Sequence, residues 1–242
     1  MNLVIDIGNT FSKVALFQSD KLVDLKVVEE LTFNEIIKFV GENSPDQFIL
    51  SSVREKEDAL FQSLSRYFKG IRMTYSTPTP VSLADYSRET IGVDRIALLV
   101  AAYKMYPQKP ALIIGCGSCI TYNYLNSDGV FEGGSISPGI FMRLKAMNKF
   151  TGQLPFAKWD GKTLPVLVAK TTEGSLLAGA VNGTVYEIDE VINRYSKTLK
   201  QELNIILSGG DAKFFEKELK NSIFAHANFV LYGLNEILQF NS

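Results

Sequence analysis

A pattern in the amino-terminal segment of this chain recurs in its second half. Residues 3–17 form an apolar run, a turn of small and amide residues, and a second run typical of a strand. Residues 112–125 repeat that order, and Gly117 lies 109 positions after Gly8. Similarity at a fixed offset indicates duplication of a structural unit. The repeat therefore predicts two related halves, each beginning with a strand, a glycine turn and a second strand.

The segments outside the repeat alternate between helix and strand. Thr32 and Glu35 have the spacing of a capping box at the start of an amphipathic helix. Residues 48–50 and 205–207 are short apolar runs typical of buried strands, whereas residues 172–199 have apolar positions at helical spacing. This alternation predicts an α/β fold with mixed sheets flanked by helices.

The length supports two small domains. A chain of 242 residues exceeds the usual size of one domain, which is about 150 residues. The elements of the first half end around Pro107. We therefore expect an N-terminal domain over residues 1–108 and a C-terminal domain over residues 109–242.

Charge and hydropathy exclude several classes of function. Lys and Arg number 25 against 26 Asp and Glu, which leaves a net charge of −1 and no general attraction to nucleic acid or anionic membranes. No apolar run reaches the length of a membrane span, and residues 1–6 do not resemble a signal peptide. With a single histidine, His-rich metal sites are nearly excluded. We expect a cytoplasmic protein that binds neither nucleic acid nor membrane.

Cys116 and Cys119 form a C-x-x-C motif, which is compatible with a redox pair or with half of a zinc site. Redox pairs of this spacing usually begin a helix, but residues 120–125 are β-branched and aromatic, as in a strand. The pattern therefore favours two small residues in a tight loop.

The first glycine turn has the composition of a phosphate site. Backbone N–H groups in such a turn bind phosphate oxygens, Lys13 adds positive charge, and Asp6 could hold Mg²⁺. The alternative is an ordinary β-hairpin turn. Three glycine turns, at Gly8, Gly117 and residues 209–210, favour nucleotide phosphate.

A second constellation lies before an apolar helix, at Gly92, Val93, Asp94 and Arg95. Asp94 could simply cap that helix, with Arg95 as a surface cation. Alternatively, a carboxylate beside an arginine could act as a base next to an anchor for a substrate carboxylate. Spacing alone leaves both interpretations open.

Together these motifs resemble type III pantothenate kinase over nearly the whole chain. The resemblance is carried by the segments 6–13, 92–95, 133–139 and 208–210, and by Thr172 seven residues before Gly179. It implies duplicated ribonuclease-H-like domains of the acetate kinase, sugar kinase, Hsp70 and actin superfamily. It also implies phosphorylation of pantothenate by ATP, the first step of coenzyme A biosynthesis, in a homodimer that uses Mg²⁺ and a monovalent cation, K⁺ or NH₄⁺.

The resemblance also implies roles for individual residues. Asp94 matches the family's catalytic base. The residues expected to contact ATP are Asp6, Ile7, Gly8, Asn9, Thr10, Phe11, Ser12, Lys13 and Ser118. Those expected to contact pantothenate are Tyr86, Gly92, Val93, Asp94, Arg95 and Thr172, with Arg95 on its carboxylate and with Tyr86 one residue nearer to Asp94 than in the family.

The second glycine turn departs from the family pattern. Gly115 stands where the family has the aspartate of its monovalent-cation site, Ser118 replaces a threonine, and Asn123 replaces a later acidic residue. The metal ligands are therefore unknown. These departures keep one alternative open: a weakly active or non-catalytic relative that binds nucleotide or pantothenate and regulates a partner. A kinase of another small hydroxylated substrate, which would share the fold, is a further alternative.

Overall fold

The computed structural model describes residues 1–54, 58–84 and 86–242, and it divides into two compact units. The first unit comprises Met1–Gln108, Leu125–Gly133 and Asn228–Ser242, and the second comprises Lys109–Tyr124 and Gly134–Ala227. The first unit thus includes two segments from beyond residue 108. The domain limits 1–108 and 109–242 stay a prediction.

The first sheet has five strands in the order β3-β2-β1-β4-β5. These strands are β1 (Asn2–Ile7), β2 (Ser12–Gln18), β3 (Lys21–Val28), β4 (Gln47–Ser52) and β5 (Lys69–Arg72). β2 pairs antiparallel with β1 and β3, whereas β4 pairs parallel with β1 and β5. The predicted strand at residues 48–50 is confirmed as part of β4.

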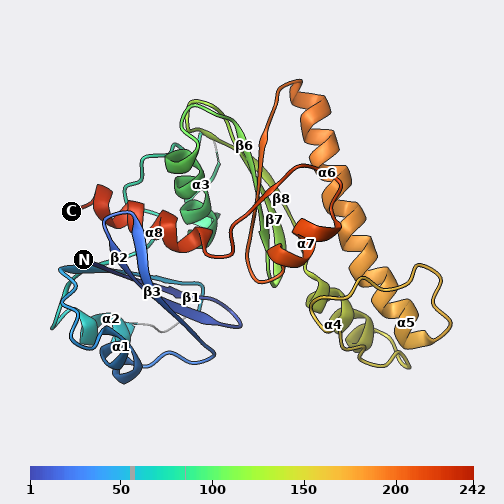
Figure 1. Cartoon of the computed structure of the whole chain (residues 1–242), viewed down its shortest axis with the longest axis horizontal. Coiled ribbons are helices and arrows are strands. Elements are labelled where there is room, and N and C mark those ends of the chain that lie inside the picture. The colour runs from blue at the N-terminus through green and yellow to red at the C-terminus, as the bar shows by residue number, and fades with distance from the viewer. Residues whose placement is uncertain (55–57, 85) are drawn as a thin grey trace. The chain divides into compact units, whose positions relative to one another are not determined.

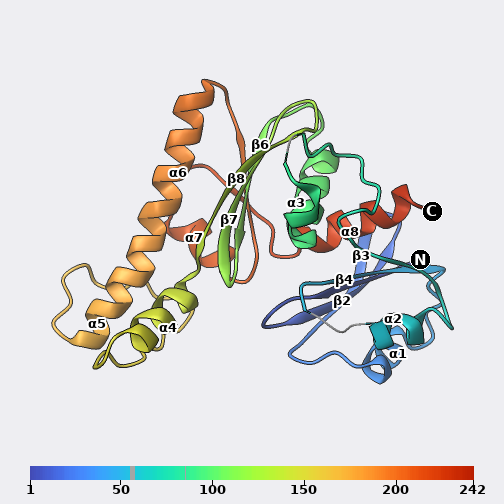
Figure 2. The same cartoon turned by 180° about the vertical axis from the view of Figure 1, so that it is seen from behind.

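Helices cover both faces of this sheet. They are α1 (Phe33–Val40), α2 (Asp58–Leu64), α3 (Val93–Met105) and α8 (Phe229–Phe240), with a short 3₁₀ helix, η1 (Arg88–Thr90). Alternate β1 residues Leu3, Ile5 and Ile7 share one core with Ile36 of α1 and Leu64 of α2. On the other face, α8 packs against β1 and β4 and lies beside α3 (Figures 1 and 2).

Individual residues explain where α1 begins and why α3 and α8 can pack closely together. The Thr32 hydroxyl accepts a hydrogen bond from the Glu35 amide, and the Glu35 carboxylate accepts one from the Thr32 amide, which confirms the predicted capping box at α1. Helices α3 and α8 approach closely because Gly233 has no side chain: an added methyl group would lie 1.8 Å from the Ala97 carbonyl oxygen.

The second sheet has the order β10-β9-β6-β7-β8. Its strands are β6 (Ala111–Cys116), β7 (Cys119–Leu125), β8 (Phe131–Pro138), β9 (Asn204–Ser208) and β10 (Phe224–Ala225). β9 pairs parallel with β6 and β10. The remaining elements are α4 (Ile140–Phe150), α5 (Thr172–Leu177), the π-helical turn η2 (Ala178–Asn182), α6 (Gly183–Leu199) and α7 (Ala212–Glu218).

The two sheets repeat one topology. With the strands of each sheet numbered from its own first strand, both have the order 3-2-1-4-5. β1 and β6 begin at Asn2 and Ala111, an offset of 109 residues, but β2 and β7 begin at Ser12 and Cys119, an offset of 107. The predicted duplication is confirmed, and the second glycine loop is two residues shorter than the first.

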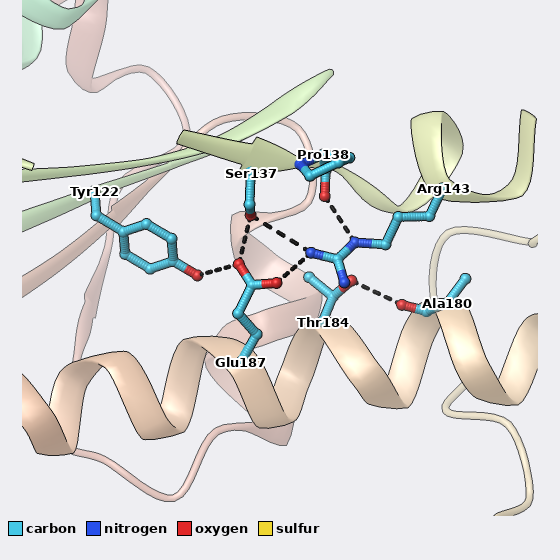
Figure 3. Close-up of polar contacts among 7 residues, drawn as sticks. All are labelled: Tyr122, Ser137, Pro138, Arg143, Ala180, Thr184 and Glu187. Carbon is cyan, nitrogen blue, oxygen red and sulfur yellow. Dashed lines mark hydrogen bonds and ion pairs between the residues drawn. The ribbon is translucent and has the colours of Figure 1, made fainter. Parts of the chain in front are cut away.

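The helix predicted over residues 172–199 is continuous but contains the π-helical turn η2 between α5 and α6. Within it, the Thr184 hydroxyl donates to the Ala180 carbonyl at 2.7 Å (Figure 3). π-Helical turns are rare and occur often at functional sites.

None of the helices in the described ranges combines the length and apolarity that a bilayer crossing needs.

Candidate active site

The first glycine loop joins β1 to β2 through four residues. The Gly8 amide donates to the Phe11 carbonyl at 3.1 Å, and a methyl group added at Gly8 would lie 2.9 Å from that oxygen. Asn9 and Thr10 are exposed. The loop is therefore tight, and its outer side is open to a ligand.

Arg54, two residues after the end of β4, binds two backbone carbonyls of this loop. Its Nε donates to the Gly8 carbonyl at 2.7 Å and its Nη2 to the Asn9 carbonyl at 3.1 Å. β4 runs parallel to β1, so the segments after both strands meet at one edge of the sheet. Sequence reasoning missed Arg54. The only available signal was its position directly after a strand.

Asp6 lies near the end of β1, opposite Lys13 of β2 and Ser51 of β4. Burial and the charge of Asp94 raise the pKa of Asp6 to about 6, against the opposing effects of the Lys13 charge and a Ser51 hydrogen bond. Burial lowers the pKa of Lys13, whose ammonium donates to the Asn228 side-chain oxygen at 3.2 Å. The strand register thus places Asp6 opposite Lys13, and the structure adds Asn228, which the sequence did not suggest.

Asp94 lies in the first turn of α3, but it is not the capping residue, which is Gly92. A methyl group added at Gly92 would lie 2.5 Å from the Asp94 Oδ1 atom, so the carboxylate packs directly against this glycine. Burial raises the pKa of Asp94, although the Arg95 backbone and side chain partly oppose it. A half-buried carboxylate with a raised pKa is suited to accept a proton.

Arg95 is buried beside two aromatic rings of the first unit. Its guanidinium carbon lies 5.6 Å from the centre of the Tyr86 ring and 5.5 Å from that of Phe131, within cation–π range. Its Nη1 atom also donates to the Tyr86 hydroxyl at 3.2 Å. The structure thus brings together the predicted substrate residues Tyr86 and Arg95, and it adds Phe131.

The second glycine loop joins β6 to β7 through Gly117 and Ser118, both exposed. The Gly117 amide donates to the Cys119 carbonyl at 3.1 Å. Cys116 and Cys119 are free cysteines, and burial raises the pKa of the Cys116 thiol, which disfavours the reactive thiolate. The C-x-x-C motif is therefore a hairpin turn, as the sequence favoured.

Neither of the two positions near this loop that depart from the family pattern, Gly115 and Asn123, carries a carboxylate. Residue 115 has no side chain, and the buried Asn123 amide nitrogen donates to the Ile113 carbonyl at 3.0 Å and to the Thr121 hydroxyl at 3.3 Å. Within residues 1–54, 58–84 and 86–242, no three His, Cys, Asp or Glu side chains gather as metal ligands. These residues do not fit a cation site held by carboxylates.

Thr172 and Ser118 belong to the second unit, whereas the other predicted site residues belong to the first. Thr172 is exposed at the start of α5, next to Thr171, whose hydroxyl caps that helix by accepting from the Gly174 amide at 3.1 Å. Ile7 and Ser12, also predicted to contact ATP, are buried in the strands that flank the first loop. Their contribution is therefore to position the backbone.

Two sheets of one topology, each with a glycine turn between its first two strands, define the duplicated ribonuclease-H-like fold of actin-like ATPases and sugar kinases. A 2-dehydro-3-deoxygalactonokinase structure from Sinorhizobium meliloti is similar, with a TM-score of 0.56 and 13% identity over 100% of this chain and 99% of that one. A Baf family transcriptional activator structure from Campylobacter jejuni has a TM-score of 0.62 and 20% identity over 99% and 98%. At these identities the likeness shows the fold alone.

The family follows from sequence comparison. The model of the type III pantothenate kinase family matches residues 2–194. The type III pantothenate kinase of Christiangramia forsetii is 41% identical over 243 residues, covering 100% of this chain and 99% of that protein. The chain belongs to the type III pantothenate kinase family.

Proposed function

We propose that this protein transfers the γ-phosphoryl group of ATP to the primary hydroxyl of pantothenate, giving 4′-phosphopantothenate, the first step of coenzyme A biosynthesis. Family membership supports the substrate, and the fold supports ATP as the phosphoryl donor. The expectations of a cytoplasmic location and of no nucleic-acid partner stay predictions.

The observation that carries this proposal lies within the first unit. Asp94 is close enough to Asp6 for its charge to raise the pKa of Asp6. This proximity supports a single site for the proposed base and the proposed phosphate loop, from Asp6 to Lys13. A hairpin turn and an unrelated helix cap, the two simpler interpretations, would not require this proximity.

The residues support a direct transfer. Asp94 accepts the proton of the pantothenate hydroxyl while the hydroxyl oxygen forms a bond to the γ-phosphorus of ATP. The bond between that phosphorus and the oxygen that bridges it to the β-phosphate breaks, and ADP leaves. Lys13 and the amides of the loop offset phosphate charge, which is the main task in phosphoryl transfer. Arg95, which is hydrogen-bonded to Tyr86, receives the substrate carboxylate.

Mg²⁺ fits the first loop, because two neighbouring half-buried carboxylates, Asp6 and Asp94, raise the need for a counter-charge. Asp6 would hold the ion. When bound, Mg²⁺ neutralises charge on the transferring phosphate. The proposed reaction does not depend on a monovalent cation, because Gly115 and Asn123 supply no carboxylate to bind one.

The test is turnover of labelled pantothenate with ATP and Mg²⁺ by the wild type and by Asp94→Asn. We expect the variant to lose about 10²–10⁴-fold in kcat, the usual contribution of a general base, while its affinity for ATP is retained. Asp24→Asn, which changes an exposed carboxylate of β3, is the matched control and keeps full activity.

Three outcomes contradict the proposal. Full activity of Asp94→Asn would make Asp94 a structural residue of α3. Wild-type protein that binds ATP or pantothenate without turnover would favour the non-catalytic alternative, and turnover of another hydroxylated substrate in a screen would redirect the proposal to that substrate.

We also propose that the protein is a homodimer. Many exposed apolar side chains of the second unit belong to α4 and to the segment that leads from it to α5. Figures 1 and 2 show the course of this segment between the two helices. The side chains are those of Phe141, Met142, Phe150, Phe156, Leu164, Val166, Leu167 and Val168, and Ile136 of β8 is also exposed. Val168 is 79% exposed and Phe150 is 78% exposed. An apolar surface of this kind usually marks an interface.

Light scattering after size-exclusion chromatography tests the dimer. We expect twice the mass of the 26.9 kDa chain for the wild type and a monomer for Leu167→Asp. Val23→Asp, at an exposed apolar position of β3, controls for the added charge and leaves the dimer intact. A monomeric wild type would contradict this proposal but not the proposed reaction.

A further inference from the structure

The carboxylate of Glu187, on α6, receives donors from three other elements of the second unit (Figure 3). The Tyr122 hydroxyl of β7 donates to it at 2.9 Å, the Ser137 hydroxyl of β8 donates to the same oxygen, and Arg143 of α4 forms an ion pair with the other. Exposed fractions are 27% for the Glu187 side chain and 22% for that of Arg143, so solvent only partly screens the pair. We call these four residues the Glu187 cluster.

The electrostatics of the cluster favour an ionised Glu187. Burial alone would raise its pKa, but hydrogen bonds from Ser137, Arg143 and Tyr122 and the charge of Arg143 outweigh burial, and the pKa is lowered. Charge-assisted hydrogen bonds of this kind are stronger than neutral ones and more sharply defined in geometry. The cluster therefore holds its four elements in one arrangement at neutral pH.

What the cluster holds is the turn from β8 into α4, residues 137–139. Ser137 is bound directly to Glu187, and the Arg143 Nη2 atom lies 3.4 Å from the same hydroxyl. The Arg143 Nε atom also donates to the Pro138 carbonyl at 2.8 Å. Side chain and backbone of this turn are thus both fixed by residues of two helices.

This turn supports the second glycine loop. The Gly139 amide donates to the Ser118 carbonyl at 3.1 Å, and a methyl group added at Gly139 would lie 2.2 Å from the Gly117 carbonyl oxygen. The Asp211 amide donates to the carbonyl of Cys116, the residue before the loop, at 3.2 Å. The loop is therefore held through its carbonyls, which leaves the exposed Ser118 hydroxyl free for a ligand.

We propose that Glu187 and Arg143 are positioning residues for ATP: by fixing residues 137–139 they hold the Gly117–Ser118 loop in the conformation that receives the nucleotide phosphates. The inference rests on the proposed function, because it takes Ser118 as an ATP contact. Neither residue takes part in the chemistry. A misplacement of about 1 Å at a binding group costs up to about a hundredfold in rate, so the support of the loop is a functional requirement.

The test separates the kinetic constants for the two substrates. We expect Glu187→Gln and Arg143→Ala to raise the KM for ATP by about tenfold or more, with the KM for pantothenate changed less than about twofold. Arg143→Lys keeps the charge but loses the two-pronged geometry, so we expect partial rescue relative to Arg143→Ala. Tyr122→Phe removes one donor of three and gives the mildest effect.

The matched control is on the same helix. Glu190 of α6 forms an exposed ion pair with Arg194 at 2.7 Å, and we expect Glu190→Gln to leave both KM values unchanged. Thermal unfolding verifies that each variant is folded. If Glu187→Gln and Arg143→Ala do not fold, Arg143→Lys and Tyr122→Phe decide by the same ratio of KM values.

Equal increases in both KM values, or none, in folded variants would make the cluster a structural brace and overturn the inference. Calorimetry with a non-hydrolysable ATP analogue keeps the inference separate from the proposed reaction. If the wild type does not phosphorylate pantothenate, the proposed function fails, but a selective loss of nucleotide affinity in Glu187→Gln still supports the positioning role. Unchanged affinity for the analogue would refute it.

Discussion

The carboxyl group of Asp94, in the first turn of α3, lies within electrostatic reach of Asp6 near the end of β1, and its charge raises the pKa of Asp6. One carboxylate belongs to a helix and the other to a strand of the same unit. Both are half-buried; burial makes ionisation of each less favourable, and the charge of Asp94 adds to this effect at Asp6. The charges of Lys13 at Asp6 and of Arg95 at Asp94 oppose these effects only in part, so the pKa of each carboxyl group stays raised.

This relationship predicts a pH dependence of activity. The pKa of Asp6 is raised to about 6 and that of Asp94 is also raised, so both carboxylates take up protons at a higher pH than ordinary aspartates. Ionised forms are required to hold Mg²⁺ and to accept the substrate proton. We expect kcat/KM for ATP to fall at least about tenfold per pH unit below about pH 6, and more steeply once both groups take up protons. Steady-state kinetics between pH 4.5 and 8.5 measure it.

Circular dichroism over the same range confirms that the protein stays folded, and Asp24→Asn, at an exposed position, is expected to show the wild-type profile. A profile that stays flat down to pH 4.5 would show that neither raised carboxylate limits the reaction.

Gly92→Ala tests how the base is positioned. The added methyl group would lie 2.5 Å from the Asp94 Oδ1 atom, so the carboxylate must move, although the backbone of residue 92 is compatible with alanine. We expect kcat to fall about 10- to 100-fold, with the midpoint of thermal unfolding little changed. Gly152→Ala, with no atom near the added methyl group, is the control. Wild-type turnover by Gly92→Ala would show that the position of Asp94 does not matter.

Arg54→Ala tests the support of the first glycine loop. Removing the guanidinium leaves the Gly8 and Asn9 carbonyls without their donor, and the loop gains freedom that ATP must remove on binding. We expect the KM for ATP to rise about tenfold, while Arg66→Ala, at an exposed arginine of the same unit, has no effect. An equal loss of affinity for pantothenate would assign Arg54 a wider role.

The departures at residues 115 and 123 predict weak dependence on the monovalent cation. Hard cations are held by oxygen ligands, and the number of charged ligands sets the affinity. Glycine and a buried asparagine, whose amide nitrogen bonds to Ile113 and Thr121, offer no carboxylate. We expect exchange of K⁺ for Na⁺ at constant ionic strength to change kcat/KM by less than about twofold. Activation by K⁺ of tenfold or more would show that other ligands hold the ion.

Much of the fold could be predicted from local pattern. The repeat around Gly8 and Gly117 predicted two halves of one topology, and the capping box at Thr32 predicted the start of α1, because such signals depend on residues close together in the chain. The two-residue difference between the glycine loops was missed, since an offset measured on the first strand says nothing about loop length. The π-helical turn η2 was missed because apolar spacing does not distinguish it from an α-helix.

By itself, the sequence determined the duplicated α/β architecture and the chemical character of the proposed site, because Asp6, Lys13, Asp94 and Arg95 stand in recognisable local motifs. Only the tertiary structure decided which groups support them. The Arg54 contact with the first loop and the three donors to Glu187 join elements that are distant in the chain. Such contacts depend on how strands pair and helices pack, and no local pattern of residues encodes them.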